Sequence, residues 1–299
     1  MPLTGSQFLE QIWNLTGEPR EQAVVDAIFS GYIPENLKRG WPVIESSGVV
    51  GGRERKIRYL ATSDYLGVGT ADDFIYTPQW PGFAQTVANA FQCILPSSRI
   101  VEQITRQAVV RVPLQIPPIA RPVSPRMEST EAWAQDTVQI RQVLRGTGKY
   151  SPGVLVAGEK KDVVVGPGLD GRVAIFGGLR DDLRSFWQPY STVHPSDYSD
   201  YSHGIRLIHR DAWVDGNPVD LVDVFRDPVL SGLVSSQGPF NPIYPTTPAP
   251  AAFRPQKPNF QLAASVPRPT KAELPEILKF GLLTGLGYAG YRLWKKYFG

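Results

Sequence analysis

Two proline-rich stretches divide this chain, and neither a long helix nor a central strand can run through them. Five prolines lie within residues 113–125 and nine within residues 242–275. Proline fixes the backbone angle φ and has no amide N–H, so it is excluded from the interiors of helices and central strands. We therefore expect an extended connector lying over the surface at the first stretch, and an extended linker or arm over residues 241–275.

Hydrophobic spacing before residue 150 predicts several helices and a few strands. Apolar residues recur there at helical intervals, and proline, serine or glycine stands where a helix would begin or end. The predicted helices cover residues 8–13, 19–29, 80–91, 98–108 and 133–146, and the predicted strands cover residues 55–60 and 73–76.

The pattern changes after Ser151, where short β-branched runs alternate with glycine-rich turns. Such runs predict antiparallel strands over residues 153–157, 162–165, 172–176 and 205–208. The chain is therefore predicted to be α+β: a helix-rich N-terminal half over residues 1–150 packs on a β-rich, mostly antiparallel half over residues 151–240. The proline-rich arm and a C-terminal helix over residues 276–299 follow.

Charge is spread unevenly along the chain. Residues 241–299 hold eight Lys or Arg and two Glu, a balance of +6, so the other 240 residues carry −3 of the net +3. A near-neutral body lacks the dense basic face that binds phosphate backbones, so nucleic acid is not an expected partner. The lone Cys93 excludes an internal disulfide and a zinc site built from several thiolates. The N-terminus lacks the pattern of a cleavable signal peptide.

All three histidines fall within sixteen residues, at His194, His203 and His209. Imidazole is the side chain whose unperturbed pKa lies nearest neutrality, so this segment concentrates the groups best suited to proton transfer and metal binding. We therefore predict a catalytic site in this segment. Its candidate residues are His194, Asp200, Tyr201, His203 and Arg206.

Three interpretations of the histidine segment stay open. On a strand, His203 and His209 would lie roughly 20 Å apart, so one metal cannot bind both; His194 and His203 with Asp197 or Asp200 could still form a mixed site. A nucleophile could instead come from Cys93, Ser191 or Ser199. The third interpretation is a hydrogen-bonded polar patch without chemistry. The sequence leaves the presence of a metal or another cofactor open.

Other polar motifs favour structural roles. Lys160-Lys161-Asp162 is typical of an exposed hairpin turn, and Asp64 and Asp72-Asp73 are typical of helix or turn caps. The glycine-rich residues 166–171 lack the helix of a phosphate-binding loop and predict a plain turn. Cys93 lies in an apolar run and is predicted to be buried.

The segment Ser202-His203-Gly204-Ile205-Arg206-Leu207 resembles the S-H-G-C-I-R-L signature of the L,D-transpeptidases. These are β-rich enzymes that remodel peptidoglycan through a cysteine nucleophile. This chain has no cysteine between Gly204 and Ile205, so that reaction does not carry over. A wider pattern is similar to uncharacterised bacterial proteins and comprises Thr62-Ser63-Asp64-Tyr65, Leu95-Pro96, Lys160-Lys161-Asp162-Val163 and Asp200-Tyr201-Ser202-His203-Gly204. The resemblance implies a bacterial or phage envelope context.

The C-terminal segment predicts an attachment site. Twelve uncharged residues separate Lys279 from Arg292, fewer than the roughly 20 that cross a bilayer. Aromatic and basic residues follow, as in an amphipathic membrane anchor or a helix that docks on another subunit.

Two functions fit the sequence. The first is a hydrolase-like protein of the cell envelope, acting on a peptidoglycan-type peptide or glycan. The alternative is a non-catalytic structural or adaptor protein of a phage particle or secretion assembly, in which the arm and the C-terminal helix bind neighbouring subunits or a membrane surface. We expect an envelope or virion location for both, and an oligomer or larger assembly is compatible with both.

Overall fold

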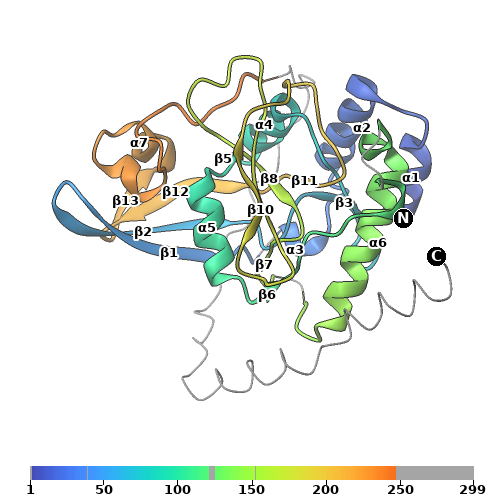
Figure 1. Ribbon diagram of the computed structural model, residues 1–299, viewed down its shortest axis with the longest axis horizontal. Helices are drawn as coiled ribbons and strands as arrows, with labels where there is room; N and C mark the ends of the chain where they lie inside the picture. Colours follow the sequence, from blue (N-terminus) through green and yellow to red (C-terminus); the bar gives the residue numbers. More distant parts are fainter. Residues whose placement is uncertain (1, 39, 121–124, 152, 247–299) are drawn as a thin grey trace. The chain divides into compact units, whose positions relative to one another are not determined.

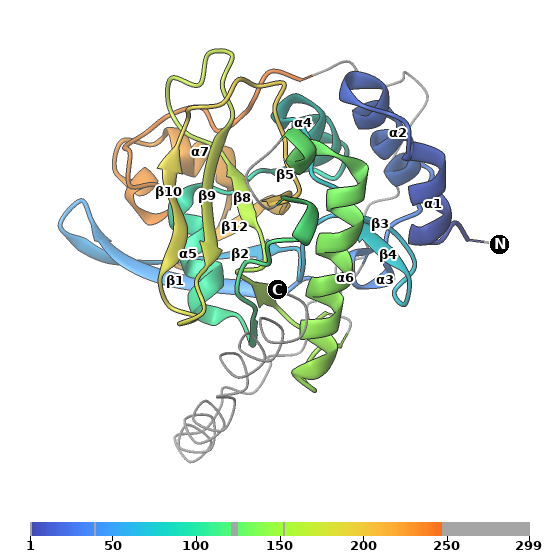
Figure 2. The same ribbon diagram turned by 45° about the vertical axis from the view of Figure 1, so that its right-hand side comes forward.

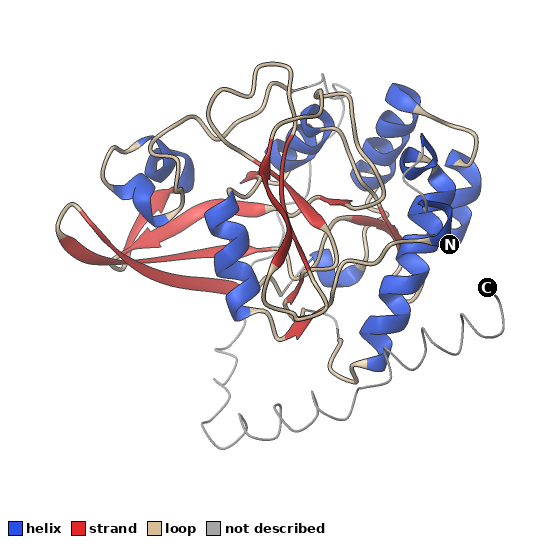
Figure 3. Cartoon of the chain, viewed as in Figure 1, coloured by secondary structure: helices blue, strands red, loops and turns tan. Residues whose placement is uncertain are grey.

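A five-stranded antiparallel sheet is the largest sheet of the computed structural model, which describes residues 2–38, 40–120, 125–151 and 153–246 (Figures 1 and 3). Its order is β1–β2–β12–β13, and β5 pairs with β12 beside β13. The strands are β1 (Val43–Val50), β2 (Arg53–Ala61), β5 (Cys93–Ile94), β12 (Ile208–Val214) and β13 (Asn217–Asp220). This sheet therefore joins strands from both sides of residue 150.

The hairpin β1–β2 projects from the body in Figure 1. Its register is continuous from Val43 opposite Leu60 to Val50 opposite Arg53. Gly51 and Gly52 connect the strands with φ values of 57° and 72°. Two consecutive positive φ angles match the two-residue turn that follows the natural twist of a hairpin, and glycine adopts them without strain.

A second sheet has four strands in the order β10–β9–β8–β11. They are β8 (Lys161–Val164), β9 (Ala174–Leu179), β10 (Phe186–Ser191) and β11 (His203–Gly204). The pairs β8–β9 and β9–β10 are antiparallel, whereas β11 runs parallel to β8. Two short pairs complete the strands, β3 (Gly67–Gly69) with β4 (Phe74–Tyr76) and β6 (Val110–Arg111) with β7 (Val156–Ala157).

Local sequence explains where the longer helices begin. Thr4 accepts a hydrogen bond from the backbone of Gln7 in a capping box, Ser97 and Ser129 cap the helices that follow them, and Pro81 occupies the first turn of its helix. The helices are α1 (Gly5–Ile12), α2 (Gly17–Phe29), α3 (Glu35–Lys38), α4 (Pro81–Ala90), α5 (Ser98–Gln107), α6 (Thr130–Gly146) and α7 (Leu221–Arg226). Three 3₁₀ turns are η1 (Pro118–Ala120), η2 (Pro125–Glu128) and η3 (Leu230–Leu233).

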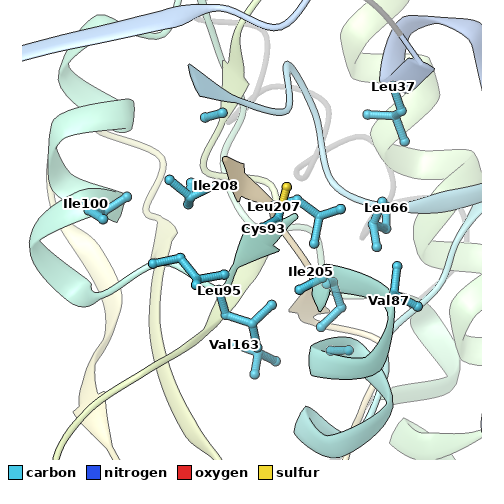
Figure 4. Close-up of a cluster of buried hydrophobic side chains, with 14 of the residues drawn as sticks. Leu37, Leu66, Val87, Cys93, Leu95, Ile100, Val163, Ile205, Leu207 and Ile208 are labelled. Atoms are coloured by element: carbon cyan, nitrogen blue, oxygen red, sulfur yellow. The ribbon is translucent and has the colours of Figure 1, made fainter. Parts of the chain in front are cut away.

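One large cluster of buried hydrophobic side chains joins both sheets to the helices, and two smaller clusters accompany it. Helix α5 contacts β1 of the first sheet and β9 of the second (Figure 2). Figure 4 shows Ile205, Leu207 and Ile208 packed among side chains from the first part of the chain, including Leu95 and Ile100. The described residues belong to one compact unit, and the predicted α+β class is confirmed.

Several local predictions differ from the structure. The connector after residue 112 is not simply draped over the surface, because Val112 is buried and the amide of Leu114 donates to Leu179 O at 2.8 Å. The predicted strand over residues 205–208 is mostly absent, because residues 205–207 connect β11 to β12 and only Ile208 lies in a strand. The beginning of the predicted arm is packed on the body, because the Tyr244 hydroxyl donates to Val164 O at 2.7 Å. Residues 247–299, with the rest of the arm and the C-terminal helix, lie outside the described residues. No helix of the described ranges is both long and apolar enough to cross a membrane.

Candidate functional site

The histidine segment reaches the interior through strand β11. His203 pairs in register with Lys161, and Gly204 pairs with Asp162. This parallel pairing places two motifs that the sequence singled out, one around residues 160–162 and one around residues 200–206, side by side inside the molecule. His203 is only 1% exposed.

An aromatic ring separates the two predicted catalytic histidines. The Tyr198 ring stacks on His194 with centroids 4.1 Å apart, and its edge-to-face contact with His203 has centroids 5.7 Å apart. Tyr198 therefore contacts both imidazoles, and its ring bridges them. Among the described residues, no group of three or more His, Cys, Asp or Glu side chains is arranged to hold a metal ion.

Asp200 anchors this arrangement. Its Oδ2 accepts a hydrogen bond from the Tyr198 hydroxyl at 3.0 Å, and its Oδ1 accepts bonds from the amide and hydroxyl of Ser202 at 2.8 and 2.5 Å. Burial acts to raise the pKa of Asp200, but the charges of His203 and Lys161 and the bonds from Ser202 outweigh it and hold the pKa below its usual value.

Burial determines the charge of His203. It lowers the pKa of the imidazole to about 4, despite the attraction of Asp200, so the ring is neutral near pH 7. Neither of its buried ring nitrogens has a hydrogen-bond partner within the described part of the chain. A buried imidazole without partners is costly, and it is the most unusual polar group of this segment.

The neighbouring motif contains a fully buried ion pair. Lys160 Nζ bonds to Asp136 Oδ2 of helix α6 and donates to the backbone carbonyl of Tyr201 at 2.6 Å. Both side chains of the pair are 0% exposed. The prediction of an exposed hairpin turn at residues 160–162 is therefore wrong. Lys160 is buried directly before β8, and Asp162 is buried within β8. Tyr201 contributes its carbonyl here, while its ring belongs to the hydrophobic core.

Arg206 points away from the histidines. It donates to Thr62 O at 2.8 Å and Val156 O at 2.9 Å, and its guanidinium lies 4.2 Å from the centroid of the Tyr65 ring. Its Nε is 3.8 Å from Asp162 Oδ1. The structure thus brings His194, Asp200 and His203 together but places Arg206 in a separate buried group.

Acidic residues gather around Arg206. Asp64 accepts hydrogen bonds from the Tyr76 hydroxyl at 3.0 and 3.2 Å, and Asp162 accepts one from the Tyr65 hydroxyl at 2.7 Å. Burial raises the pKa of Asp64 and, together with the charge of Asp64, raises that of Glu159 well above its usual value. Protonation of Glu159 would remove the repulsion between its charge and that of Asp64.

This second group was missed by reasoning from the sequence. Asp64 was predicted to cap a helix or turn, whereas Asp73 fills that role by accepting from the amides of Gly5 and Ser6 at the start of α1. Glu159 and Asp136 were not predicted as site residues, because isolated acidic residues are usually exposed. The motifs that resemble bacterial proteins did include Asp64 and residues 160–163, so that resemblance was the one sequence signal for this group.

A further buried acid, Glu21, lies on helix α2 close to the histidine segment. Glu21 accepts a hydrogen bond from the amide of Trp80 at 2.9 Å, and Ser199 contacts the same carboxyl group. Burial raises the pKa of Glu21 to about 7. Arg20, next to it in sequence, lies 4.0 Å from the Trp133 ring and donates to Glu128 O at 2.6 Å.

We call these residues together the buried charged centre, defined by Glu21, Asp64, Asp136, Glu159, Lys160, Asp162, Asp200, His203 and Arg206. Each member is at most 4% exposed. Buried ions without a path to solvent cost free energy and specify how the surrounding elements must pack. The buried charged centre therefore constrains how the surrounding helices and strands pack against one another.

Comparisons with protein families, with curated proteins and with solved structures give no match. The position that follows Gly204, where the transpeptidase signature has its cysteine, is held by Ile205, which is buried in the core. What the chain does must therefore be inferred from its own geometry.

Proposed function

We propose that this chain is a non-catalytic structural or adaptor protein of a cell-envelope, phage-particle or secretion assembly. One observation carries the proposal: the residues with catalytic chemistry are enclosed. His203 and Arg206 are 1% exposed and Asp200 is 4% exposed, and the Tyr198 ring contacts both His203 and His194. A substrate needs access to a group before that group can act on it.

The buried charged centre has a role in this proposal. Ion pairs enclosed in a core are poor stabilisers, but each of them disfavours any packing that leaves a charge unpaired. Lys160 fits only where Asp136 and the Tyr201 carbonyl are both present. The centre thereby fixes β8, β11 and α6 relative to one another, as a rigid scaffold requires.

The proposed attachment elements are the arm over residues 241–275 and the helix over residues 276–299, most of which lie outside the described residues. Support comes from charge, since residues 241–299 carry +6 whereas the rest of the chain carries −3. Flotation of the chain with and without residues 272–299 on vesicles containing anionic lipid separates the two kinds of partner. Loss of flotation on truncation indicates a membrane, and no flotation of either form indicates a protein subunit.

The test of the central claim is a peptidoglycan digestion assay. Wild-type protein and the His203→Gln variant are incubated with purified peptidoglycan, and released fragments are measured by mass spectrometry. We expect no release by either protein. Release by the wild type that is lost in His203→Gln would establish an enzyme and overturn the proposal.

A specific observation favours the hydrolase-like function as a second candidate. Both ring nitrogens of His203 lack partners within the described residues, and only the Tyr198 ring separates them from the partly exposed His194. If Tyr198 swings away, His203 and Asp200 gain access to solvent. The Tyr198→Ala variant tests this candidate in the same assay, because uncovering His203 would then produce or increase fragment release.

A further inference from the structure

Two adjoining hollows follow the end of the five-stranded sheet, away from the buried charged centre. The larger, of about 580 Å³, is lined by residues that include Asn89, Gln92, Arg210, Asp211 and Asp220. The smaller, of about 450 Å³, shares Asp211 and Asp220 and adds Trp213 and Pro218. These sizes fall within the roughly 300–1,000 Å³ typical of small-ligand pockets.

Strand register places four of the lining residues on one face of the pair β12–β13. Asp211 pairs with Asp220, and Trp213 pairs with Pro218. Residues directly opposite each other in an antiparallel pair, and residues two apart along a strand, share a face of the sheet. The indole of Trp213 therefore lies on the same face as the two carboxylates, one step along the strand.

The rim of the larger hollow is held in place by the backbone. Helix α4 ends at Ala90, and Gln92 then adopts a φ of 56°, which is uncommon for a residue with a side chain. Its carbonyl accepts a hydrogen bond from the amide of Arg210 at 3.0 Å. This bond ties the end of α4 to β12 and keeps the side chains of Asn89 and Gln92 beside the hollow.

Two of the three charged side chains that line the larger hollow form an ion pair. Arg210 Nε donates to both carboxylate oxygens of Asp220, at 3.2 and 3.0 Å, and its terminal nitrogen bonds to the same carboxylate. Asp211 adds a second carboxylate whose side chain is 79% exposed. Two carboxylates and one guanidinium leave one net negative charge, which disfavours anionic ligands.

We propose that these two hollows bind a short glycan whose sugars carry uncharged or amino-type substituents. The carboxylate of Asp211 and the carboxamides of Asn89 and Gln92 present donors and acceptors for the hydroxyl groups of a sugar ring, whereas Arg210 and Asp220 are bonded to each other. The flat indole of Trp213 provides an apolar surface for the C–H face of the next ring. The inference is independent of the proposed function, because none of these residues belongs to the buried charged centre.

The probe is tetra-N-acetylchitotetraose, titrated into the full chain by isothermal calorimetry. Trp213→Ala removes the stacking surface, Trp213→Phe keeps a flat ring, and Asp211→Asn keeps the shape while removing one charge. Trp187→Ala is the matched control. Trp187 on β10 is 42% exposed and Trp213 is partly exposed, and each ring has an arginine over it, Arg180 at 4.3 Å for Trp187 and Arg58 at 5.6 Å for Trp213.

We expect saturable binding that weakens about tenfold in Trp213→Ala, the effect of losing one well-stacked ring. Trp213→Phe and Trp187→Ala should bind within about threefold of the wild type. The anionic tetragalacturonate should bind more weakly than the chito-oligosaccharide, and Asp211→Asn should narrow that difference.

Three results would overturn the inference. They are the absence of saturable binding at millimolar glycan, equal losses of affinity in Trp213→Ala and Trp187→Ala, and tighter binding of the anionic glycan by the wild type. If Trp213→Ala does not fold, Asp211→Asn and Trp213→Phe decide the question through the charge preference. Peptidoglycan cleavage is scored in a separate assay, so failure here leaves the proposed function standing.

Discussion

Removal of the Lys160 ammonium is the most informative perturbation of this protein. Lys160→Met keeps most of the side-chain volume but leaves Asp136 buried without its charged partner and leaves the Tyr201 carbonyl without a donor. Lys160 is 0% exposed, so water cannot replace the lost ammonium unless the core opens. The substitution therefore measures what the buried pair contributes.

The magnitude follows from burial. The pKa of Asp136 is raised by burial to about 6 from an ordinary value of 3.8, even though Lys160 lowers it. At 1.36 kcal/mol per pKa unit, keeping Asp136 ionised at neutral pH already costs about 3 kcal/mol. Breaking a buried ion pair by removing one partner typically costs 3–5 kcal/mol, and we expect a loss of about 4 kcal/mol for Lys160→Met at pH 8.

The sign of the pH dependence provides a second measurement. Without Lys160, the pKa of Asp136 rises above about 6, because the attraction and hydrogen bond that lowered it are gone. A carboxyl group with a raised folded-state pKa contributes stability below its unfolded value near 4, and that stability is lost as pH rises through the folded value. Lys160→Met should therefore cost less at pH 5, where Asp136 is protonated, than at pH 8.

The assay is urea unfolding at both pH values, followed by circular dichroism, with Asp136→Leu and the double variant completing a cycle. Lys38→Met is the control, because Lys38 and Glu35 form a 3.6 Å pair that is about half exposed, worth under about 1 kcal/mol. We expect the double variant to recover most of the loss. A loss for Lys160→Met that matches the control, or that does not change with pH, would refute the buried-pair reasoning.

Two further predictions concern other parts of the buried charged centre. Glu21→Gln should raise stability at pH 8 by about 3 kcal/mol and leave it nearly unchanged at pH 4.5, because burial raises the pKa of Glu21 to about 7 and makes its ionised form costly. Thermal unfolding across this pH range measures the effect, and a constant difference between the two proteins would contradict it. Gly204→Ala should destabilise the chain by roughly 2–4 kcal/mol, because the added Cβ would lie 2.6 Å from a Tyr65 ring carbon and 2.7 Å from Lys160 Cβ. Urea unfolding tests this, and Gly168→Ala, a glycine in a positive-φ turn with open space around it, separates overpacking from backbone strain.

Local signals were enough to predict most helices. Serine at positions 97 and 129 and proline at position 81 stand where α5, α6 and α4 begin, and each acts through contacts within one turn. The formation of several strands depends on partners that are distant in sequence, and this could not be predicted from local signals. β10 contains Pro189 and β13 contains Pro218, which argued against strands, yet pairing with β9 and β12 forms both of them.

The sequence predicted which residues of the candidate site lie together but not how deeply they are buried, because burial also depends on distant strand partners. Clustering along the chain placed His194, Asp200 and His203 together, and they do lie together around Tyr198. The burial of the cluster could not be predicted, because a run of charged residues such as 159–162 is usually exposed to solvent. Only the pairing of β11 with β8 reveals that Lys160 is enclosed.

The order of strands in the large sheet has a consequence for synthesis on the ribosome. The hairpin β1–β2 emerges early, but the strand that covers the open edge of β2 is β12, from the end of the body. During translation, that edge presents unsatisfied amide and carbonyl groups until residues 208–214 leave the exit tunnel. A nascent chain stalled near residue 150 would therefore be a substrate for chaperones, not a finished domain awaiting its neighbour.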